Sequence, residues 1–158
     1  MVTSKDIKTL NEFLENRGVS YVLTGTAALF YQGALPEGIE VHDIDIIVLT
    51  NDETRPALQA MFKELEKLSG CQYENKHYEQ SVYVFKVGAN NIKVNAFEGR
   101  WEELACNCSS MNIDGITILV NKVMAVLKAK FALNREKDHL FFTKLICQLS
   151  KMFLCSKK

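Results

Sequence analysis

The sequence of 158 residues has no excess charge of either sign, because 19 lysines and arginines balance 19 aspartates and glutamates. Proteins that bind nucleic acid over a broad surface usually carry a clear positive excess, so only a local basic patch could serve that purpose here. Hydrophobic residues make up 47% of the chain, which is enough for an ordinary core and argues against disorder. The length predicts a single domain over residues 1–158, with at most a helical appendage.

The sequence also lacks the cysteine and histidine patterns of disulfide-rich or zinc-binding proteins. Its five cysteines are odd in number and irregular in spacing, which argues against a secreted disulfide framework. Cys106 and Cys108 are too close together for the usual zinc spacing, and no matching pair of cysteines or histidines follows. The histidines are scattered along the chain at His42, His77 and His139. Reduced thiols in a cytoplasm are therefore the favoured interpretation.

No apolar run in the sequence is long enough to span a bilayer. The first six residues are polar and lack the hydrophobic segment of a signal peptide. We therefore expect a soluble, cytoplasmic protein with no membrane partner. The sequence gives no indication of the oligomeric state.

Apolar periodicity and turn residues predict alternating helices and strands in the first half of the chain, followed by a β-hairpin and a helical last third. A hairpin places an antiparallel pair beside the early strands, so the fold class is α/β (α+β) with a mixed central sheet flanked by helices. The expected elements are a helix over 4–17, strands over 20–23 and 43–49, helices over 27–32 and 51–70, a less certain strand over 71–77, hairpin strands over 81–87 and 92–97, a helix or loop over 101–110, a strand over 113–118, and helices over 119–133 and 136–152.

Within the single domain, we expect an α/β core over residues 1–112 and C-terminal helices over 113–152 that pack on it. The strand over 43–49 is a continuous run of isoleucine, valine and leucine, which favours a central position with both faces covered. The helix over 119–133 is expected to bury an apolar stripe made of Val120, Val123, Met124, Leu127 and Phe131.

Two carboxylates stand at the head of that central strand, in the sequence Asp43-Ile44-Asp45. Side chains alternate faces along a strand, so Asp43 and Asp45 point the same way. Two like charges so close together are tolerated if they face water or if a divalent cation lies between them. Because aspartate is depleted in strands, metal binding is favoured over a merely solvated strand end.

A turn of small residues, Thr24-Gly25-Thr26, lies between the first strand and the following helix. Such a turn can present backbone N–H groups to an anion, although an ordinary strand-to-helix turn with a capping hydroxyl explains it equally well. The turn becomes evidence for an anion site only because the acid pair lies close to it in the sequence. A carboxylate pair that binds metal, beside a turn that binds phosphate, is the equipment of phosphoryl or nucleotidyl transfer.

Gly25-Thr26-Ala27-Ala28, followed by Asp43-Ile44-Asp45, resembles the nucleotidyltransferase superfamily with the DNA polymerase beta-type fold. The resemblance is to its minimal bacterial members, including the abortive-infection toxins of toxin–antitoxin systems. It extends over about residues 20 to 145. The later residues that match this group's pattern are Ile116-x-Ile118, Lys122, Lys128 or Lys130, and Arg135-x-Lys137-Asp138.

The resemblance implies that Asp43 and Asp45 bind Mg²⁺ (or Mn²⁺) and a nucleoside triphosphate, whose phosphates contact Gly25 and Thr26. Asp138 would orient a cation or act as a base, unless it is simply an acid at a helix N-terminus. The acceptor would be a hydroxyl on an RNA such as tRNA, on a protein or on a small molecule. The cations expected to neutralise phosphate charge, each of which could instead be part of a solvated helix face, are Lys122, Lys130, Arg135 and Lys137.

The sequence departs from the family pattern at three places. Thr26 replaces the usual glycine or serine, Asn95 stands where many members have a third carboxylate, and Phe141 and Phe142 occupy the region where the last helix often has an acid. Either Glu98 substitutes for the third acid, or one metal is held tightly, or catalysis has been lost. The alternative function is therefore an impaired relative that binds a nucleotide or a protein; the simplest alternative is an acid pair that faces water.

Overall fold

The computed structural model describes the backbone over residues 1–69 and 82–156 and the side chains over 1–64 and 82–154. The strand expected over 71–77 lies outside the described residues. The helices and strands in chain order are α1 Ser4–Glu15, β1 Tyr21–Thr24, α2 Gly25–Tyr31, β2 Ile44–Leu49, α3 Arg55–Ser69, β3 Val82–Val87, β4 Ile92–Gly99, α4 Trp101–Leu104, a 3₁₀ turn η1 Ala105–Asn107, β5 Cys108–Ile113, β6 Ile116–Asn121, α5 Val123–Leu133 and α6 Glu136–Ser156.

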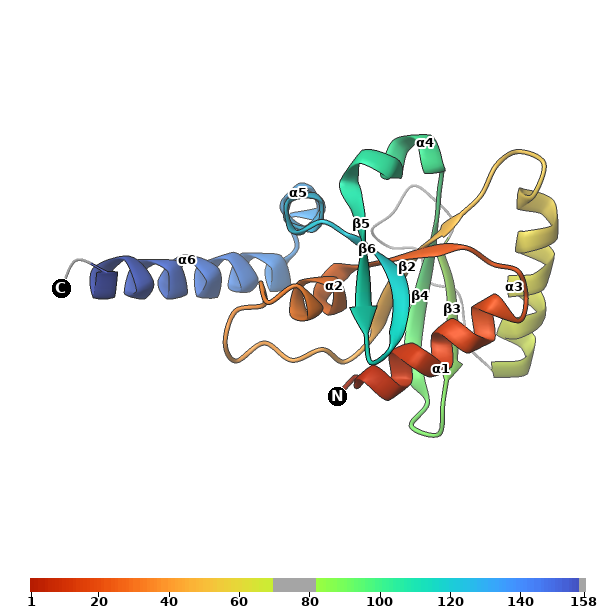
Figure 1. Ribbon diagram of the computed structural model, residues 1–158, viewed down its shortest axis with the longest axis horizontal. Coiled ribbons are helices and arrows are strands. Elements are labelled where there is room, and N and C mark those ends of the chain that lie inside the picture. The colour runs from red at the N-terminus through yellow and green to blue at the C-terminus, as the bar shows by residue number, and fades with distance from the viewer. Residues whose placement is uncertain (70–81, 157–158) are drawn as a thin grey trace.

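The strands form one mixed sheet in the order β3-β4-β2-β1-β6-β5 (Figure 1). β2 is central: it pairs antiparallel with β1 and parallel with β4. The β3–β4 and β5–β6 hairpins form the two ends of the sheet. The mixed α/β architecture and the central position of the strand with the acid pair are as the sequence predicts.

One face of the sheet carries the main core. Ile44, Ile46 and Val48 on β2 are fully buried on this face, and Val94 and Ala96 of β4 lie beside them in register. Helices α1 and α3 cover it through an aromatic cluster: the Phe62 ring stacks on Tyr83 at 4.7 Å, and the Phe13 ring stacks on Phe85 at 5.7 Å. Burial of these large side chains supplies the main stabilising free energy, so the opposite face is free to carry polar groups.

The expected helix over 119–133 is wrong in its first turn. Residues 116–121 form β6, which pairs with β5 and β1, and α5 begins at Val123. Large β-branched residues stand at every second position here, at Ile116, Ile118 and Val120, which fits a strand better than a helix. The sheet thus extends past residue 112, the limit expected for the α/β core.

The expected apolar stripe of α5 is right in part: Val123 and Leu127 pack against the core, but Met124 and Phe131 are exposed and Val126 is the buried residue of this helix. The buried side of α5 is therefore centred on Val126, between Val123 and Leu127. No helix among the described residues is long and apolar enough to cross a bilayer.

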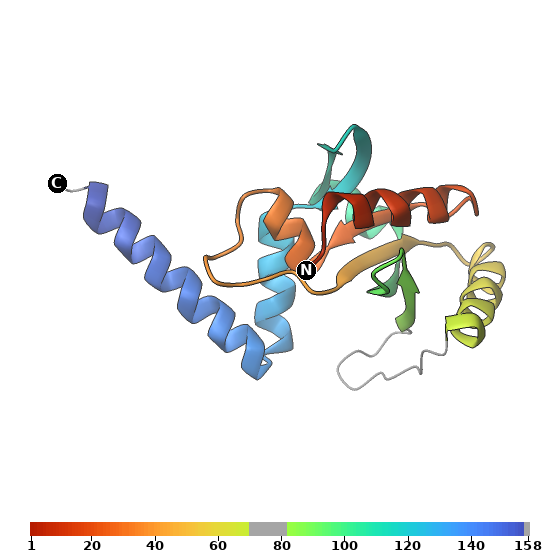
Figure 2. The same ribbon diagram turned by 90° about the horizontal axis from the view of Figure 1, so that it is seen from below.

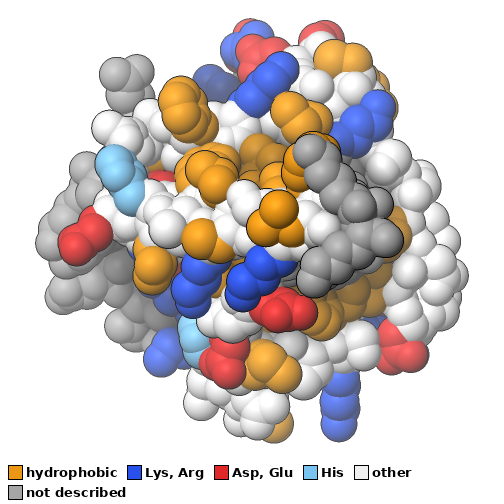
Figure 3. Space-filling view, turned by 90° about the vertical axis from the view of Figure 1, so that its left-hand side faces the viewer, with side chains coloured by type: hydrophobic (Ala, Val, Ile, Leu, Met, Phe, Trp, Pro, Cys, Tyr) orange, Lys and Arg blue, Asp and Glu red, His pale blue; other side chains and the backbone are white. Residues whose placement is uncertain are grey.

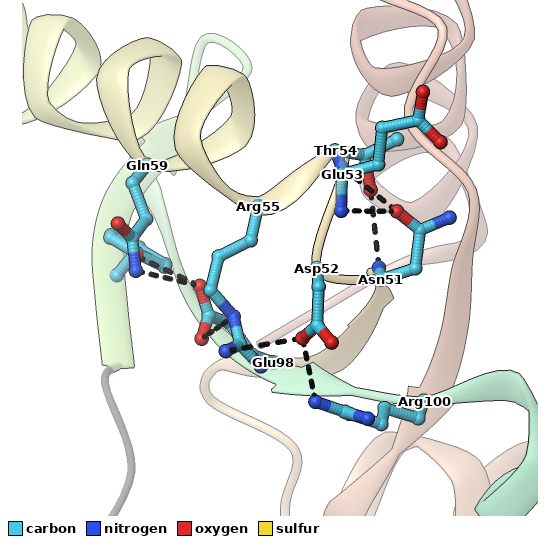
Figure 4. Close-up of polar contacts among 9 residues, drawn as sticks. Asn51, Asp52, Glu53, Thr54, Arg55, Gln59, Glu98 and Arg100 are labelled. Atoms are coloured by element: carbon cyan, nitrogen blue, oxygen red, sulfur yellow. Dashed lines mark hydrogen bonds and ion pairs between the residues drawn. The ribbon is translucent and has the colours of Figure 1, made fainter.

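A cluster of polar side chains ties the start of α3 to the ends of β2 and β4 (Figure 4). The Glu98 carboxylate, 11% exposed, accepts hydrogen bonds from the Tyr83 hydroxyl at 3.1 Å and the Gln59 amide at 3.4 Å. Arg55 Nε lies 3.5 Å from this carboxylate, an ion-pair distance. Glu98 is therefore engaged in a structural cluster away from Asp43 and Asp45, and it does not substitute for a third acid beside them.

We expect Arg55→Met to lower the free energy of unfolding by about 1–3 kcal/mol, because it leaves the mostly buried Glu98 carboxylate without a cation. The matched control is Arg100→Met, which removes the surface pair between Arg100 and Asp52 and should cost at most about 1 kcal/mol. Urea unfolding measures both. Equal losses from the two variants would contradict a special role for the buried pair.

Candidate active site

The β1–α2 turn and the head of β2 are in direct contact. Thr24 and Asp45 are partners in the antiparallel register, so Gly25, at the start of α2, lies against the Asp45 side chain. Gly25 has φ +66°, and a Cβ built there would lie 2.4 Å from Asp45 Oδ2. Both the backbone conformation and the lack of space require glycine at this position. The structure thus brings together the two motifs that the sequence suggested as one site.

Asn95 joins the two carboxylates. It is the register partner of Asp45 in the parallel β2–β4 pair, so both side chains are on the same face of the sheet. Its amide Nδ2 donates to Asp45 Oδ1 at 2.8 Å and to Asp43 Oδ2 at 3.2 Å. Asn95 therefore occupies the place where the sequence led us to look for a third acid. It supplies hydrogen-bond donors to the acid pair where an acid would add charge.

The acid pair remains electrostatically unfavourable. Burial, and then the neighbouring charge of Asp43, raise the pKa of Asp45 to about 6. The hydrogen bond from Asn95 and the positive charges of Lys130 and Lys137 oppose this rise without cancelling it. A cation or a proton at this place would therefore relieve the repulsion between the two carboxylates.

Lys130 of α5 reaches the same region from the helical side. Its Nζ donates to the Thr26 hydroxyl at 3.3 Å and lies 4.9 Å from the centre of the Phe141 ring. Burial lowers the pKa of Lys130, and the charges of Asp138 and Asp45 counteract that effect in part. An ammonium group beside a hydroxyl and close to carboxylates is well placed to contact an anionic ligand.

Arg135 and Asp138 form a closed pair at the start of α6. Asp138 accepts hydrogen bonds from Arg135 Nε at 2.7 Å, from its Nη2 at 3.0 Å and from its backbone N–H at 3.2 Å. Burial alone would raise the pKa of Asp138, but these bonds and the guanidinium charge outweigh it, so the pKa lies below its usual value. A carboxylate held in this way orients its cation and is a weak base.

Two cavities meet beside Lys130, and one of the two carboxylates lines each. A cavity of about 170 Å³ lies between the sheet face and α5, lined by Gly25, Asp45 and Arg135 and by apolar side chains such as Ile47 and Phe97. A cavity of about 410 Å³ lies between the 38–43 loop and α6. Its polar lining comprises Thr26, Glu40, His42, Asp43, Lys130, Lys137, Asp138 and Lys144.

The structure therefore gathers most of the residues that the sequence suggested around these two cavities: Gly25, Thr26, Asp43, Asp45, Lys130, Arg135, Lys137 and Asp138. Lys128 and Glu98 line neither cavity. Lys122 is also outside them, because its Nζ donates to the Cys106 backbone carbonyl at 3.2 Å.

The sequence interpretation missed Asn121, which is buried at the end of β6 and lines the smaller cavity. Its amide donates to the Thr24 hydroxyl at 3.1 Å, and its backbone carbonyl accepts from Gln32 at 2.8 Å. Asn121 was missed because it was assigned to the expected helix over 119–133, whereas it ends β6. A polar residue that ends an alternating run of β-branched residues was the signal that could have found it.

Comparisons with known proteins rest on structure alone, because neither a family model nor a curated protein matches the sequence. TM1012 of Thermotoga maritima, assigned as a nucleotidyltransferase, superposes with a TM-score of 0.56 at 21% identity, over 94% of this chain and 96% of that one. The crystal structure of ANT(2'')-Ia in complex with adenylyl-2''-tobramycin gives a TM-score of 0.57 at 15% identity, over 92% of this chain and 87% of that one.

A third structure, an antigenic nucleotidyltransferase-like protein from Paracoccidioides brasiliensis, gives a TM-score of 0.51 at 13% identity, over 90% of this chain and 73% of that one. The chain has the nucleotidyltransferase fold. This confirms the fold that the acid pair and the glycine turn suggested. At these identities the likeness extends to the fold, and what the site does must be argued from its own residues.

The residues of this nucleotidyltransferase-fold protein fit one kind of metal ion. The described residues contain no group of three or more histidines, cysteines or carboxylates that could enclose a metal. Mg²⁺ usually takes one or two carboxylates and completes its coordination with water and substrate phosphates. Asp43 and Asp45, with their unrelieved repulsion, match that requirement. Asn95 directs its NH₂ at both carboxylates, so in this orientation it bridges the acids and is not itself a ligand.

The raised pKa of Asp45 predicts a pH-dependent stability. Its folded value of about 6 is above the ordinary value of 3.8, so the folded state holds an extra proton between these pH values. Stability therefore falls as pH rises through 6. Asp45→Asn removes this loss and should be more stable than the wild type by about 1–3 kcal/mol at pH 8, with no gain at pH 4.

Urea unfolding of both proteins across this pH range, with a chelator present, measures the difference. Asp52→Asn is the control, because Asp52 is exposed and pairs with Arg55 and Arg100 rather than with another carboxylate. A wild type that is the more stable protein at pH 8 would show that the acid pair is already compensated.

Proposed function

We propose that this protein is a nucleotidyltransferase that moves a nucleoside monophosphate from a nucleoside triphosphate to a hydroxyl acceptor, with Mg²⁺ (or Mn²⁺) held by Asp43 and Asp45. The observation that carries the proposal is the acid pair itself. It is packed against Gly25, bridged by Asn95 and placed between two cavities. The fold shared with ANT(2'')-Ia, whose structure contains adenylyl-2''-tobramycin, supports transfer of this kind.

The larger cavity suits the triphosphate. Its positive groups are Lys130, Lys137 and Lys144, and Thr26 adds a hydroxyl that already accepts a hydrogen bond from Lys130. Charge-assisted hydrogen bonds from lysine to phosphate oxygens are among the stronger polar contacts. We assign the phosphate contacts to Thr26, Lys130 and Lys137. Lys122, which bonds to Cys106 instead, has no part in this assignment.

The smaller cavity suits the group that bears the acceptor hydroxyl. It adjoins Asp45, its walls include Ile47 and Phe97, and its volume of about 170 Å³ has room for a small moiety. Arg135 also lines this cavity, with its guanidinium oriented by Asp138. We therefore assign Asp138 a positioning role, because a carboxylate with a lowered pKa is poorly suited to accept the proton of the acceptor.

A divalent ion bound by Asp43 and Asp45 would lower the pKa of the acceptor hydroxyl and stabilise the pyrophosphate leaving group. Asn95 keeps the two carboxylates together on the sheet face by donating to both. Gly25 allows the turn to approach them closely. The acceptor hydroxyl would belong to an RNA such as tRNA, to a protein or to a small molecule. The resemblance to abortive-infection toxins favours a role in a toxin–antitoxin or phage-defence system.

The second candidate function is a relative of the same fold that binds nucleotide but turns it over poorly. Asn95 favours this reading, because it adds no negative charge where a third carboxylate would help to hold a second metal ion. The two candidates share the nucleotide site and differ in turnover, so binding and transfer must be measured separately.

For binding, we expect a nucleoside triphosphate with Mg²⁺ at about 100 times its Kd to raise the Tm by roughly 5–10 °C, because the ligand binds the folded state selectively. Lys130→Gln should weaken binding about 10-fold or more by removing a charge-assisted contact. Lys122→Gln removes the same charge from a lysine outside the two cavities and should change the Kd by no more than about twofold. Thermal shift titrations with each nucleotide give these values. The absence of a shift with every nucleotide would refute both candidate functions.

For turnover, we expect label from an α-³²P nucleoside triphosphate to appear on a tRNA, protein or small-molecule acceptor in a cell extract. Asp43→Ala and Asp45→Ala should abolish the transfer, because they remove the metal ligands. Asn95→Asp distinguishes the two candidates: it should impair an active enzyme tuned to one metal ion but increase the label in a decayed one. If the protein binds a nucleotide but neither the wild type nor any variant transfers label, the second candidate function, nucleotide binding without turnover, is the correct one.

A further inference from the structure

The last helix, α6, carries an apolar stripe that continues beyond the body of the protein. Apolar residues recur at spacings of three and four, which places them on one side of a helix. Phe142 and Leu145, at the start of the stripe, pack partly against the core. From Ile146 to Leu154 every residue except Gln148 is exposed. Figures 1 and 2 both show this half of α6 leading away from the sheet.

The stripe also continues onto α5, because the Phe131 ring meets the Phe142 ring edge-on at 6.1 Å. Hydrophobic side chains gather at this end of the molecule (Figure 3). The five large apolar residues of the combined surface, here called the α6 stripe, are exposed as follows: Phe131 75%, Ile146 62%, Leu149 54%, Met152 62% and Phe153 59%.

The α6 stripe is large enough for a stable contact. With about 200 Å² for a fully exposed side chain of this size, the five exposed fractions amount to roughly 600 Å². Two copies in contact would bury about 1,200 Å², which reaches the lower bound of specific protein–protein interfaces. A continuous apolar surface of this size on a monomer usually marks an interaction site.

The charges of α6 are arranged so that two copies can meet. Lys137, Lys144 and Lys151 follow each other at intervals of seven residues, on the side of the helix away from the stripe. The residues that border the stripe over its exposed part, Gln148 and Ser150, are uncharged. Like charges therefore do not face each other when one stripe meets an identical one, and a charged partner finds no complementary border.

We propose that α6 pairs antiparallel with α6 of a second copy of this chain. The body of the protein lies at the N-terminal end of α6, so a parallel pair would bring the two bodies into the same space, while an antiparallel pair separates them (Figures 1 and 2). The two-fold axis that matches the stripe to itself places Ile146 opposite the partner's Leu149 and Phe142 opposite the partner's Phe153.

This pairing reaches the neighbourhood of the site. Phe131 and Phe142 line a cavity of about 310 Å³ between α5 and α6, and Lys130 lines it too. The partner's Phe153 packs beside these two rings and closes the outer side of that cavity. The dimer therefore adds a wall next to Lys130, and its existence does not depend on the reaction proposed for the site.

The oligomeric state of the full chain tests the proposal. Size-exclusion chromatography with light scattering at micromolar concentrations should give a mass near twice 17.9 kDa. Leu149→Glu puts a charge into the middle of the stripe and should weaken the dimer at least 100-fold, giving the monomer mass. Lys151→Glu changes a charge on the opposite side of the same helical turn and should leave the dimer intact. Circular dichroism and thermal unfolding confirm that each variant is folded.

Ile146→Glu is the second variant, in case Leu149→Glu alters the helix, and it too should give the monomer. A wild type that is monomeric at 100 µM overturns the proposal. So does a dimer that survives both glutamate substitutions, because its interface must then lie elsewhere. Binding of a monomeric wild type to vesicles of neutral phospholipid would assign the stripe to a lipid surface instead.

Discussion

The structure depends on how two like charges are kept together at the head of the central strand. Asp43 and Asp45 repel each other, and the burial of Asp45 makes its charge more costly still. Two features offset this cost locally: the amide of Asn95 donates to both carboxylates, and Lys130 approaches from α5. The free energy gained by burial offsets the remaining repulsion, because the side chains on the other face of the same strand are completely buried in the main core. One strand therefore carries both the stabilising burial and the destabilising site.

The side of the sheet on which each polar group lies explains its role. Asn95 and Glu98 are both on β4, but they are three residues apart and so point to opposite faces. Asn95 meets the acid pair, whereas Glu98 meets Arg55, Tyr83 and Gln59. The alternation of a strand thus decides which polar residue can act at the site. The same reasoning, applied to the sequence, would already have excluded Glu98 as the missing acid.

The sequence predicted the parts of the site that depend on local rules. Strand alternation placed Asp43 and Asp45 together, and small residues after β1 indicated the turn at Gly25. Contacts between distant segments were harder to foresee. Asn121 was missed because a run of apolar residues around 119 fits both a strand and a helix, and only pairing with β1 and β5 decides between them. The engagement of Lys122 with Cys106 likewise depends on how the β5–β6 hairpin brings two segments together.

The replacement of a third carboxylate by Asn95 changes the charge balance and therefore the demands on a ligand. A site with three carboxylates carries one more negative charge and so holds divalent ions more strongly. Here two carboxylates face the ammonium groups of Lys130 and Lys137, and the charge of Arg135 is offset by Asp138. The formal charges of these groups nearly cancel, whereas a third carboxylate in place of Asn95 would need one more proton or cation to balance it. Because metal affinity follows the charge and number of the ligands, the proposed function would require only a single ion that arrives with its nucleotide. The amide of Asn95, which departs from the family pattern, is then the group that donates to both remaining acids and keeps them together in the absence of metal.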